Sequence, residues 1–568
     1  MTPLLLLLAA APSFKTAVGF ERAPAPARAA LAKDGFAVLQ GEEAHFFALY
    51  DRNAYEKVPS FISSDVVLHV FHTRFDEQLS DLELKQSLLA LLAFSRGQLA
   101  RCFTAWPKTG EPPDWLRKLC TYHAVAVALA TDAPLGADAR VEKDVIAIAE
   151  LVKRAGGPAS VSPCGQPVEF SLFKPRGHYE RYALQPFFKA SMWYSQCAFD
   201  LSKDLARAAE IARLIDEPAK TELAKITAVR ELVSGPPDDA GFEQLRALGT
   251  MAAFPAPLDV EPLKAKVKSL PAAKVPTLPA TTAPVFRLLG QSATTDTGTL
   301  DPLKPTTLSL LTAMASPTFE TGPGLTGAWL GIIATLVRPL EQQPPFASSE
   351  AWQNHTRVTA AGAWAELRHD TLLYVKQPLV MAEGGDEKEL PASKVGGYVE
   401  PRPDVYKKLG ELSDRLSKAS GEPNDPLKEF IAFLISTSEL ELANKPFPKA
   451  IDERLRVVGT ELEGLCRTHG DRTPSEGLIA DVLTVRDPET KADSIFHVAV
   501  GDVDELWVVV PRSGKQVLMR GGAFSFYELS QPTRLSDNDW NALRWDKDPP
   551  RPSWATPIKM PKKPKMKD

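Results

Sequence analysis

The sequence predicts a mainly helical protein that carries a small antiparallel β-sheet element near its C-terminus. Long segments repeat apolar residues at three- and four-residue spacing, which is the period of an amphipathic helix. Four short segments between residues 495 and 529 are instead rich in β-branched and aromatic residues, as strands are. We therefore expect a large multi-helix body, α+β overall.

The predicted helices occupy most of the chain up to residue 468. Each places apolar residues on one face, as packing in a helical body requires. The helices are expected at Asp65–Leu84, Lys85–Ala105, Asp114–Ala130, Asp138–Arg154, Leu184–Ile215, Lys220–Val233, Pro302–Ala315, Leu325–Arg338, Ser348–Gln377, Asp404–Ala419, Asp425–Ala443 and Ile451–Thr468.

The predicted strands follow one another closely, which indicates antiparallel pairing. Arg512-Ser513-Gly514 is a candidate hairpin turn. Ser536 is expected to cap a last short helix, with Asp539 at the third helical position. The strands are expected at Ile495–Val500, Glu505–Pro511, Lys515–Arg520 and Ala523–Leu529.

These elements suggest four segments. Residues 1–13 are expected to be a signal peptide, 14–475 the helical body, 476–545 a small β-rich subdomain packed on the body, and 546–568 a disordered basic tail. Residues 236–284 are rich in Pro and Ala, and we interpret them as a surface connection with one short helix inside the body.

The N-terminal residues predict export. The apolar run Leu4–Leu8 precedes small residues, which is the pattern of a secretory signal. The run is short, no Lys or Arg precedes it, and no cysteine directly follows it, so a lipid anchor is not indicated. We expect a periplasmic or extracellular protein without a transmembrane span, because no stretch reaches about 18 uninterrupted apolar residues.

Charge and cysteine content narrow the classes of function. The 568 residues carry a formal net charge of −5, which argues against nucleic-acid binding because phosphate binding needs clustered cations. The five cysteines include no Cys-x-x-Cys pair, which argues against a disulfide framework or a zinc ribbon. Cys102 and Cys120 lie in adjacent predicted helices and could pair, and at least one thiol is expected to be free and buried.

The sharpest local pattern is a polar stripe on a mostly apolar predicted helix. Asp65, His69, His72 and Asp76 lie at about 0°, 40°, −20° and 20° around its axis. Imidazole and carboxylate groups bind zinc, iron or nickel, and two histidines three residues apart can share one ion. A solvent-exposed face or a set of buried hydrogen bonds is favoured over a divalent metal, and no cofactor is evident.

Two loops add candidate ligand-binding and catalytic residues. Arg176 and His178 could bind an anionic group, or they could tie their loop to helix ends, which is the favoured alternative. Glu400 is a candidate catalytic carboxylate that could pair with Arg176 or Arg368. The alternative for Glu400 is a solvated loop carboxylate.

The predicted helix that ends near Gln377 holds a further group of titratable residues. Glu366, His369 and Asp370 are candidate catalytic residues, because a carboxylate beside an imidazole can serve as an acid–base pair. Arg368 is a candidate ligand-binding residue. The same residues could form a buried ion-pair network between helices, and we favour this network.

Several of these motifs lie in blocks that match one family in the same order. The blocks are Val58–Asp65, Leu68–His72, Phe173–Tyr179, Met192–Trp193, Phe286–Gln291, Trp364–Gln377, Gly397–Pro401, Phe524–Glu528 and Arg534–Asp537. With these blocks the chain resembles the uncharacterised bacterial proteins catalogued as domain of unknown function 3160, from about Gly35 to Trp545. The resemblance implies export and a helical fold, and it implies no activity.

The chain departs from this family's pattern in two places. Residues 317–326 lack the Gly-Leu-Asp stretch of the family, and Ser292 stands where an Arg is expected. A site built from these segments would therefore be altered in this chain.

The sequence leaves the function unknown and supports two hypotheses. The first is a hydrolase of an envelope or extracellular polymer, since water is a co-substrate that needs no cytosolic cofactor. The alternative is a non-catalytic binding or scaffold protein of the envelope, with a polymer or a protein as partner. The first gains support if His69, His178, His369 and Glu400 surround one pocket, and the second if each is paired in the core.

Overall fold

A computed structural model of the chain describes residues 13–133, 138–271, 283–301, 304–340, 342–376, 396–467, 477–486, 492–547 and 549–559. Within these residues helices predominate over strands, which confirms the predicted mainly helical fold class. The predicted signal peptide up to residue 12 and the tail beyond residue 559 lie outside the described residues.

The predicted helices are largely present, some of them shorter than expected. Helix α16 (Pro403–Ser420) shows why they form, because it buries Val405, Leu409, Leu412 and Leu416 on one face. The others are α3 (Ser64–Leu82), α4 (Leu88–Thr104), α5 (Asp114–Ala130), α6 (Glu142–Arg154), α9 (Glu217–Ser234), α13 (Thr307–Met314), α14 (Gly324–Leu336), α15 (Glu350–Asp370), α17 (Asp425–Leu442) and α20 (Asp537–Lys547).

Two of the predicted helices are wrong, because each is interrupted and forms two shorter helices. In residues 184–215 the helix ends at Cys197, which is bonded to Cys164, and a short strand follows before the next helix begins. Residues 451–468 likewise form two helices. The resulting elements are α7 (Gln185–Gln196), β5 (Phe199–Asp200), α8 (Leu205–Leu214), α18 (Lys449–Arg456) and α19 (Val458–Cys466).

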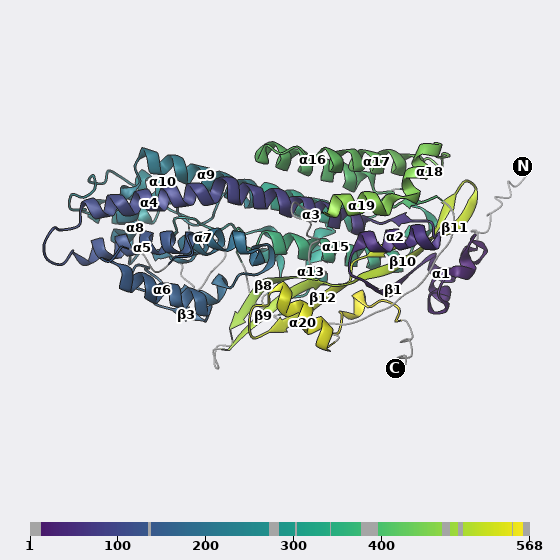
Figure 1. The fold of residues 1–568 in the computed structure, drawn as a ribbon, viewed down its shortest axis with the longest axis horizontal. Helices are drawn as coiled ribbons and strands as arrows, with labels where there is room; N and C mark the ends of the chain where they lie inside the picture. The colour runs from purple at the N-terminus through teal and green to yellow at the C-terminus, as the bar shows by residue number, and fades with distance from the viewer. Residues whose placement is uncertain are drawn as a thin grey trace, which may run out of the picture.

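The structure also contains more short helices than the sequence predicted. The Pro- and Ala-rich connection contains two of them in its described part, where one was predicted. The elements are α1 (Arg28–Asp34), α2 (Phe46–Glu56), α10 (Phe242–Ala247), α11 (Glu261–Val267) and α12 (Thr295–Thr299). Figure 1 shows an elongated molecule, with α4 to α10 at one end and the sheet strands, α1 and α2 toward the other.

The longer strands form two three-stranded antiparallel sheets, ordered β1-β10-β11 and β12-β9-β8, and the short two-residue strands pair separately in twos. Strands β9 to β12 are the four predicted ones, whereas β1 and β8 were not predicted. Strand β1 comes from the N-terminal region and pairs with β10, which unites segments more than 450 residues apart. The strands are β1 (Phe36–Glu43), β8 (Leu478–Arg486), β9 (Asp493–Val500), β10 (Val503–Arg512), β11 (Lys515–Ala523) and β12 (Phe526–Gln531).

Helix α15 connects the helical body to the sheet. It packs against α3 and α14 and also against β8 and β9. Gly362 allows a close approach, because a Cβ atom there would lie 2.4 Å from the ring of Phe524. The polar residues of α15 are therefore held between the other helices and the sheet.

The described C-terminal residues form a capped helix and then contact strands β10 and β1. Ser536 caps α20 as predicted: its Oγ accepts from the backbone N–H of Asp539, and the Asp539 carboxylate accepts from the backbone N–H of Ser536 at 2.9 Å. Part of the segment predicted as a disordered tail is ordered. Arg551 forms a buried ion pair with Asp504, and the backbone N–H of Ile558 donates to the carbonyl of Val38 at 2.9 Å.

The cysteines pair differently from the expectation. The disulfide joins Cys164 to Cys197, whereas Cys102 and Cys120 are buried free thiols. Cys466 is also a buried free thiol, as expected for at least one cysteine. Among the described helices, none combines the length and the apolar character needed to cross a membrane.

Thiol titration tests this pairing. In denaturant without reductant, three of the five thiols should react, and with reductant all five should react, because only Cys164 and Cys197 are bonded. Peptide mapping by mass spectrometry identifies the bonded pair. A Cys102–Cys120 bond in the purified native protein would contradict the prediction.

Candidate functional site

The polar stripe of α3 faces the interior of the helical body. α3 packs against α15, α16 and α19, and apolar residues cover most of its circumference. Asp65, His72 and Asp76 are buried, and His69 keeps 15% of its side chain exposed. The solvent-exposed alternative for the stripe is therefore wrong, and each polar group needs a partner inside the protein.

The partners of the stripe come largely from α15. Successive stripe residues meet α15 residues of increasing number, so the two helices run side by side in the same direction. The pairs are Asp65 with the Thr359 hydroxyl (3.1 Å), His69 Nδ1 with Glu366 (2.6 Å) and His72 Nδ1 with Asp370 (2.9 Å).

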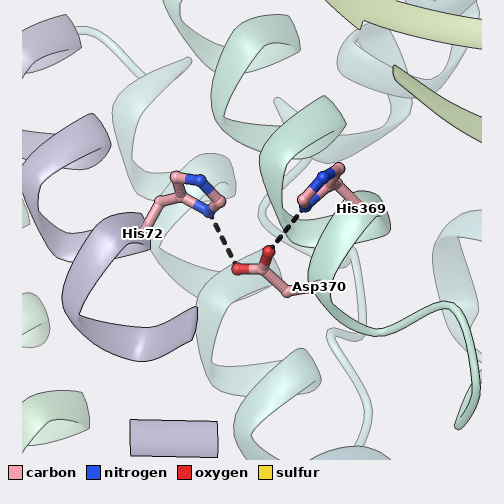
Figure 2. A group of neighbouring side chains, drawn as sticks. All are labelled: His72, His369 and Asp370. Atoms are coloured by element: carbon pink, nitrogen blue, oxygen red, sulfur yellow. Dashed lines mark hydrogen bonds and ion pairs between the residues drawn. The ribbon is translucent and has the colours of Figure 1, made fainter. Parts of the chain in front are cut away.

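The middle of the stripe extends into a histidine–carboxylate centre, which we define as His69, His72, Glu366, His369, Asp370 and Asp537. In Figure 2 the Asp370 carboxylate lies between the imidazoles of His72 and His369. Its Oδ2 is 2.9 Å from Nδ1 of His72, and its Oδ1 is 2.9 Å from Nδ1 of His369. Nε2 of His369 lies 3.0 Å from the carboxylate of Asp537, the first residue of α20.

Imidazoles are the basic partners of the carboxylates in this centre. Within the described part of the chain, no Lys or Arg forms an ion pair with Glu366, Asp370 or Asp537. Burial opposes charge on His369, but Asp537 and Asp370 raise its pKa to about 10. Burial likewise opposes charge on His72, yet Asp370 and Glu366 raise its pKa. Burial alone would raise the pKa of Asp370, but the two imidazoles hold it well below its usual range.

At the N-terminal end of α3, two carboxylates accept from backbone groups. Asp65 accepts from the N–H of Phe524 at 2.9 Å, and Glu400 accepts from the N–H of Ser64 at 2.6 Å. Burial raises the pKa of both carboxyl groups. The expected pairing of Glu400 with Arg176 or Arg368 is wrong, because Glu400 instead binds the first turn of α3.

At the other end of the stripe, His178 lies between two carboxylates. Its Nδ1 is hydrogen-bonded to Asp76, and its Nε2 is 2.9 Å from Glu83. Glu83 also accepts from the hydroxyls of Tyr179 at 2.7 Å and Tyr374 at 2.5 Å. Glu83 begins the π-helical turn that joins α3 to α4, so this irregular turn presents a carboxylate to three donors.

Arg176 binds a carboxylate of the chain itself rather than an open cleft. Its guanidinium contacts Asp481 at 2.6 Å and 3.1 Å, and Arg534 pairs with the same carboxylate. Burial would raise the pKa of Asp481, but Arg176 and Arg534 hold it well below its usual range. The pKa of Arg176 is lowered by burial.

Arg368 is the candidate residue that lacks a close partner. It is buried, and three of its guanidinium nitrogens make no hydrogen bond. The nearest carboxylate oxygen in an ion pair belongs to Asp296, 3.8 Å from Nη1, and burial lowers the pKa of Arg368. Arg368 is therefore a buried cation whose only described ion pair is the long contact with Asp296.

The structure brings most of the predicted site residues together along α3, and it adds several that were not predicted. Glu83 could have been found, because it lies seven residues after Asp76 and continues the stripe by two turns. Asp537 and Asp481 carry no such signal. Their positions depend on α20 and β8, which only the tertiary structure places beside α15.

The described cavities differ in how well they suit a ligand. Glu400 and Arg402 line a cavity of about 100 Å³, which is small for an organic ligand. A cavity of about 410 Å³, the aromatic cavity, lies between α5 and α8. Its lining includes Trp115, Lys118, Leu119, Tyr122, Pro163, Phe199, Arg207, Glu210, Ile211, Arg213, Pro255 and Leu258.

We predict that Asp481→Asn is strongly destabilising. The change leaves Arg176 and Arg534 buried without a carboxylate, which should lower the free energy of unfolding by about 3–5 kcal/mol at pH 7. Because the folded-state pKa of Asp481 is depressed, its contribution is complete above about pH 4 and is lost as the pH falls further. Urea denaturation of variant and wild type measures the difference.

Asp414→Asn is the matched control. Asp414 pairs with Lys428 on the surface, where both side chains are more than 60% exposed, so stability should be nearly unchanged. Equal denaturation midpoints for Asp481→Asn and wild type would show that the Arg–Asp–Arg cluster does not stabilise the fold.

Comparison with known proteins identifies one family over most of the chain. A family model described as protein of unknown function (DUF3160) matches residues 25–307 and 322–555. No curated protein matches the chain, and no solved structure does. The two matched segments contain every residue of the histidine–carboxylate centre and the lining of the aromatic cavity. The chain therefore belongs to the DUF3160 family of proteins of unknown function.

Proposed function

We propose that this protein is exported and acts as a non-catalytic binding protein of the cell envelope. In this proposal it takes a saccharide unit of an envelope or extracellular polymer in the aromatic cavity. The size and lining of that cavity are the observation that carries the proposal.

The cavity has the composition of a saccharide site. Its volume of about 410 Å³ lies in the range of small-molecule sites. Trp115 is partly exposed and offers an apolar ring face on which the C–H face of a sugar ring can stack, whereas the lining residues Tyr122 and Phe199 are buried behind it. Lys118 and Arg207 add hydrogen-bond donors for sugar hydroxyl or carboxylate groups.

The disulfide supports export. Cys164 and Cys197 are bonded next to the cavity, whose lining includes the neighbouring Pro163 and Phe199. Structural disulfides persist in oxidising compartments and are rare in the cytosol. The apolar run at the N-terminus points in the same direction.

The hydrolase hypothesis has less support. Glu366 and Asp370 are fully buried, His369 is 5% exposed, and each is bonded to a group of the protein. A general acid or base must come within hydrogen-bond reach of the substrate, directly or through one water. Glu400 lines only the small cavity and binds the backbone of α3. These contacts favour a structural role for the four residues.

We predict that Trp115→Ala weakens polymer binding by about tenfold or more, because it removes an aromatic ring from the cavity wall. Co-sedimentation with purified peptidoglycan, chitin and cellulose measures binding. Trp545→Ala is the control, since Trp545 is 91% exposed on α20 and should leave binding unchanged. Equal losses in both variants, or no binding of wild type to any of the three polymers, would contradict the proposal.

Export is tested with a reporter. Residues 1–30 fused to an alkaline phosphatase that is active only outside the cytoplasm should give enzyme activity in a bacterial host. Leu5→Arg together with Leu7→Arg should abolish that activity, because a charged run no longer resembles a signal. Activity that is absent from the unaltered fusion would argue against export by this segment.

A further inference from the structure

Three side chains of the histidine–carboxylate centre have the geometry of metal ligands. One ligand atom each from His72, His369 and Asp370 lies within 4.8 Å of the others. Metal–ligand distances of about 2.0–2.2 Å place neighbouring ligand atoms roughly 3–3.5 Å apart and opposite ones about 4.2 Å apart. The two 2.9 Å contacts between Asp370 and the imidazoles therefore suit a shared ion after a small outward shift.

The surroundings of His369 fit the same role. Histidines that bind a metal usually donate their other ring N–H to a carboxylate, which fixes the tautomer and the ring orientation. Nε2 of His369 lies 3.0 Å from Asp537, so a proton on Nε2 leaves the Nδ1 lone pair directed toward Asp370 and His72. Asp537 is itself held, because its Oδ1 accepts from the N–H of Ile479 at 2.9 Å.

The charges of the centre also favour a cation. Glu366, Asp370 and Asp537 are buried, and no described Lys or Arg forms an ion pair with them. Oε2 of Glu366 is buried and makes no hydrogen bond. Buried carboxylates are retained when they are paired or coordinate a metal.

We propose that His72, His369 and Asp370 bind one divalent first-row transition-metal ion, for which Zn²⁺ is the probe. Glu366 lies outside this group of three, and its Oε2, which is buried and makes no hydrogen bond, would have to move closer to serve as a fourth ligand. Mixed imidazole and carboxylate donors suit zinc, iron and nickel better than magnesium or calcium.

The ion would join elements that are far apart in the sequence. Its ligands come from α3 and α15, and Asp537 adds the start of α20. The ligands are almost entirely buried, so the site resembles a structural metal site without an open position for substrate. The proposal concerns stability and is independent of the saccharide-binding proposal.

Metal analysis of the full-length protein tests the site. Elemental analysis should find about one equivalent of a divalent transition metal per chain after purification, or after refolding with Zn²⁺. Removing the metal with a chelator under mildly denaturing conditions, followed by refolding without metal, should lower Tm. Adding Zn²⁺ should restore the original Tm. With Co²⁺ the protein should show the visible absorption of a protein-bound ion, and X-ray absorption should show imidazole scattering.

Variants separate this site from adventitious binding. His72→Gln combined with Asp370→Asn should reduce the metal content to below about 0.1 equivalent. Asp537→Asn should weaken Zn²⁺ binding about 10- to 100-fold, as loss of a partner to a ligating histidine does. His123→Gln is the matched control: His123 is equally buried but hydrogen-bonds Tyr194 in α7, so one equivalent should remain.

Three results would overturn the proposal. Wild-type protein without metal after refolding in Zn²⁺ or Co²⁺, with an unchanged Tm, would show that the centre is a network of protonated histidines and carboxylates. Metal retained by the double variant would place the ion elsewhere. Should the double variant fail to fold, wild-type X-ray absorption without imidazole scattering would overturn it equally.

Discussion

The pairing of α3 with α15 is the interaction on which the rest of the structure depends. Both helices are surrounded by other elements, so the polar stripe of α3, in which His69 keeps 15% of its side chain exposed, has little access to water that could replace its partners. A buried carboxylate without a partner costs several kcal/mol, whereas the same group in a complete network costs little. The fold is therefore stable only when the stripe and its partners are aligned.

The alignment of the polar pairs also sets the register and the direction of α3 relative to α15. Apolar residues such as Val66, Val70 and Phe71 would tolerate several offsets between packed helices, since their attraction is not directional. Pairs of His69 with Glu366 and of His72 with Asp370 are directional, and a shift of one turn would break both. We infer that the buried pairs select one register and one direction for α3 against α15.

The centre also links the helical body to the sheets. Asp537 follows the last strand, and Asp481 lies on β8, yet both bind residues of the helical body. The N–H of Phe524 donates to Asp65 at the start of α3. Through these contacts, the strands and the loops that follow them supply partners to the buried polar residues of the helical body. The aromatic cavity lies beside the disulfide, between α5 and α8, and Figure 1 shows these two helices at one end of the molecule, away from α15 and α20.

Local sequence patterns predicted the elements whose formation depends on residues within the same segment. The apolar period predicted α5 with its observed bounds, and the Ser536 cap was predicted together with its Asp539 partner. The break at Cys197 was not predictable, because it depends on a disulfide with Cys164 and on the pairing of β5 with the distant strand β6 (Val285–Phe286). Strand β1 was missed for the same kind of reason, since its partner β10 lies more than 450 residues away.

The sequence by itself determined which chemical groups share one face of α3, because the helical period places Asp65, His69, His72 and Asp76 in one line. It could not determine what that line faces. Only the tertiary structure decided that the stripe meets α15 and the loop at His178 in the interior, and that α15 in turn meets the start of α20. The physical reason is that side-chain periodicity is a local property, whereas burial and partners depend on helices and strands brought together from distant parts of the chain.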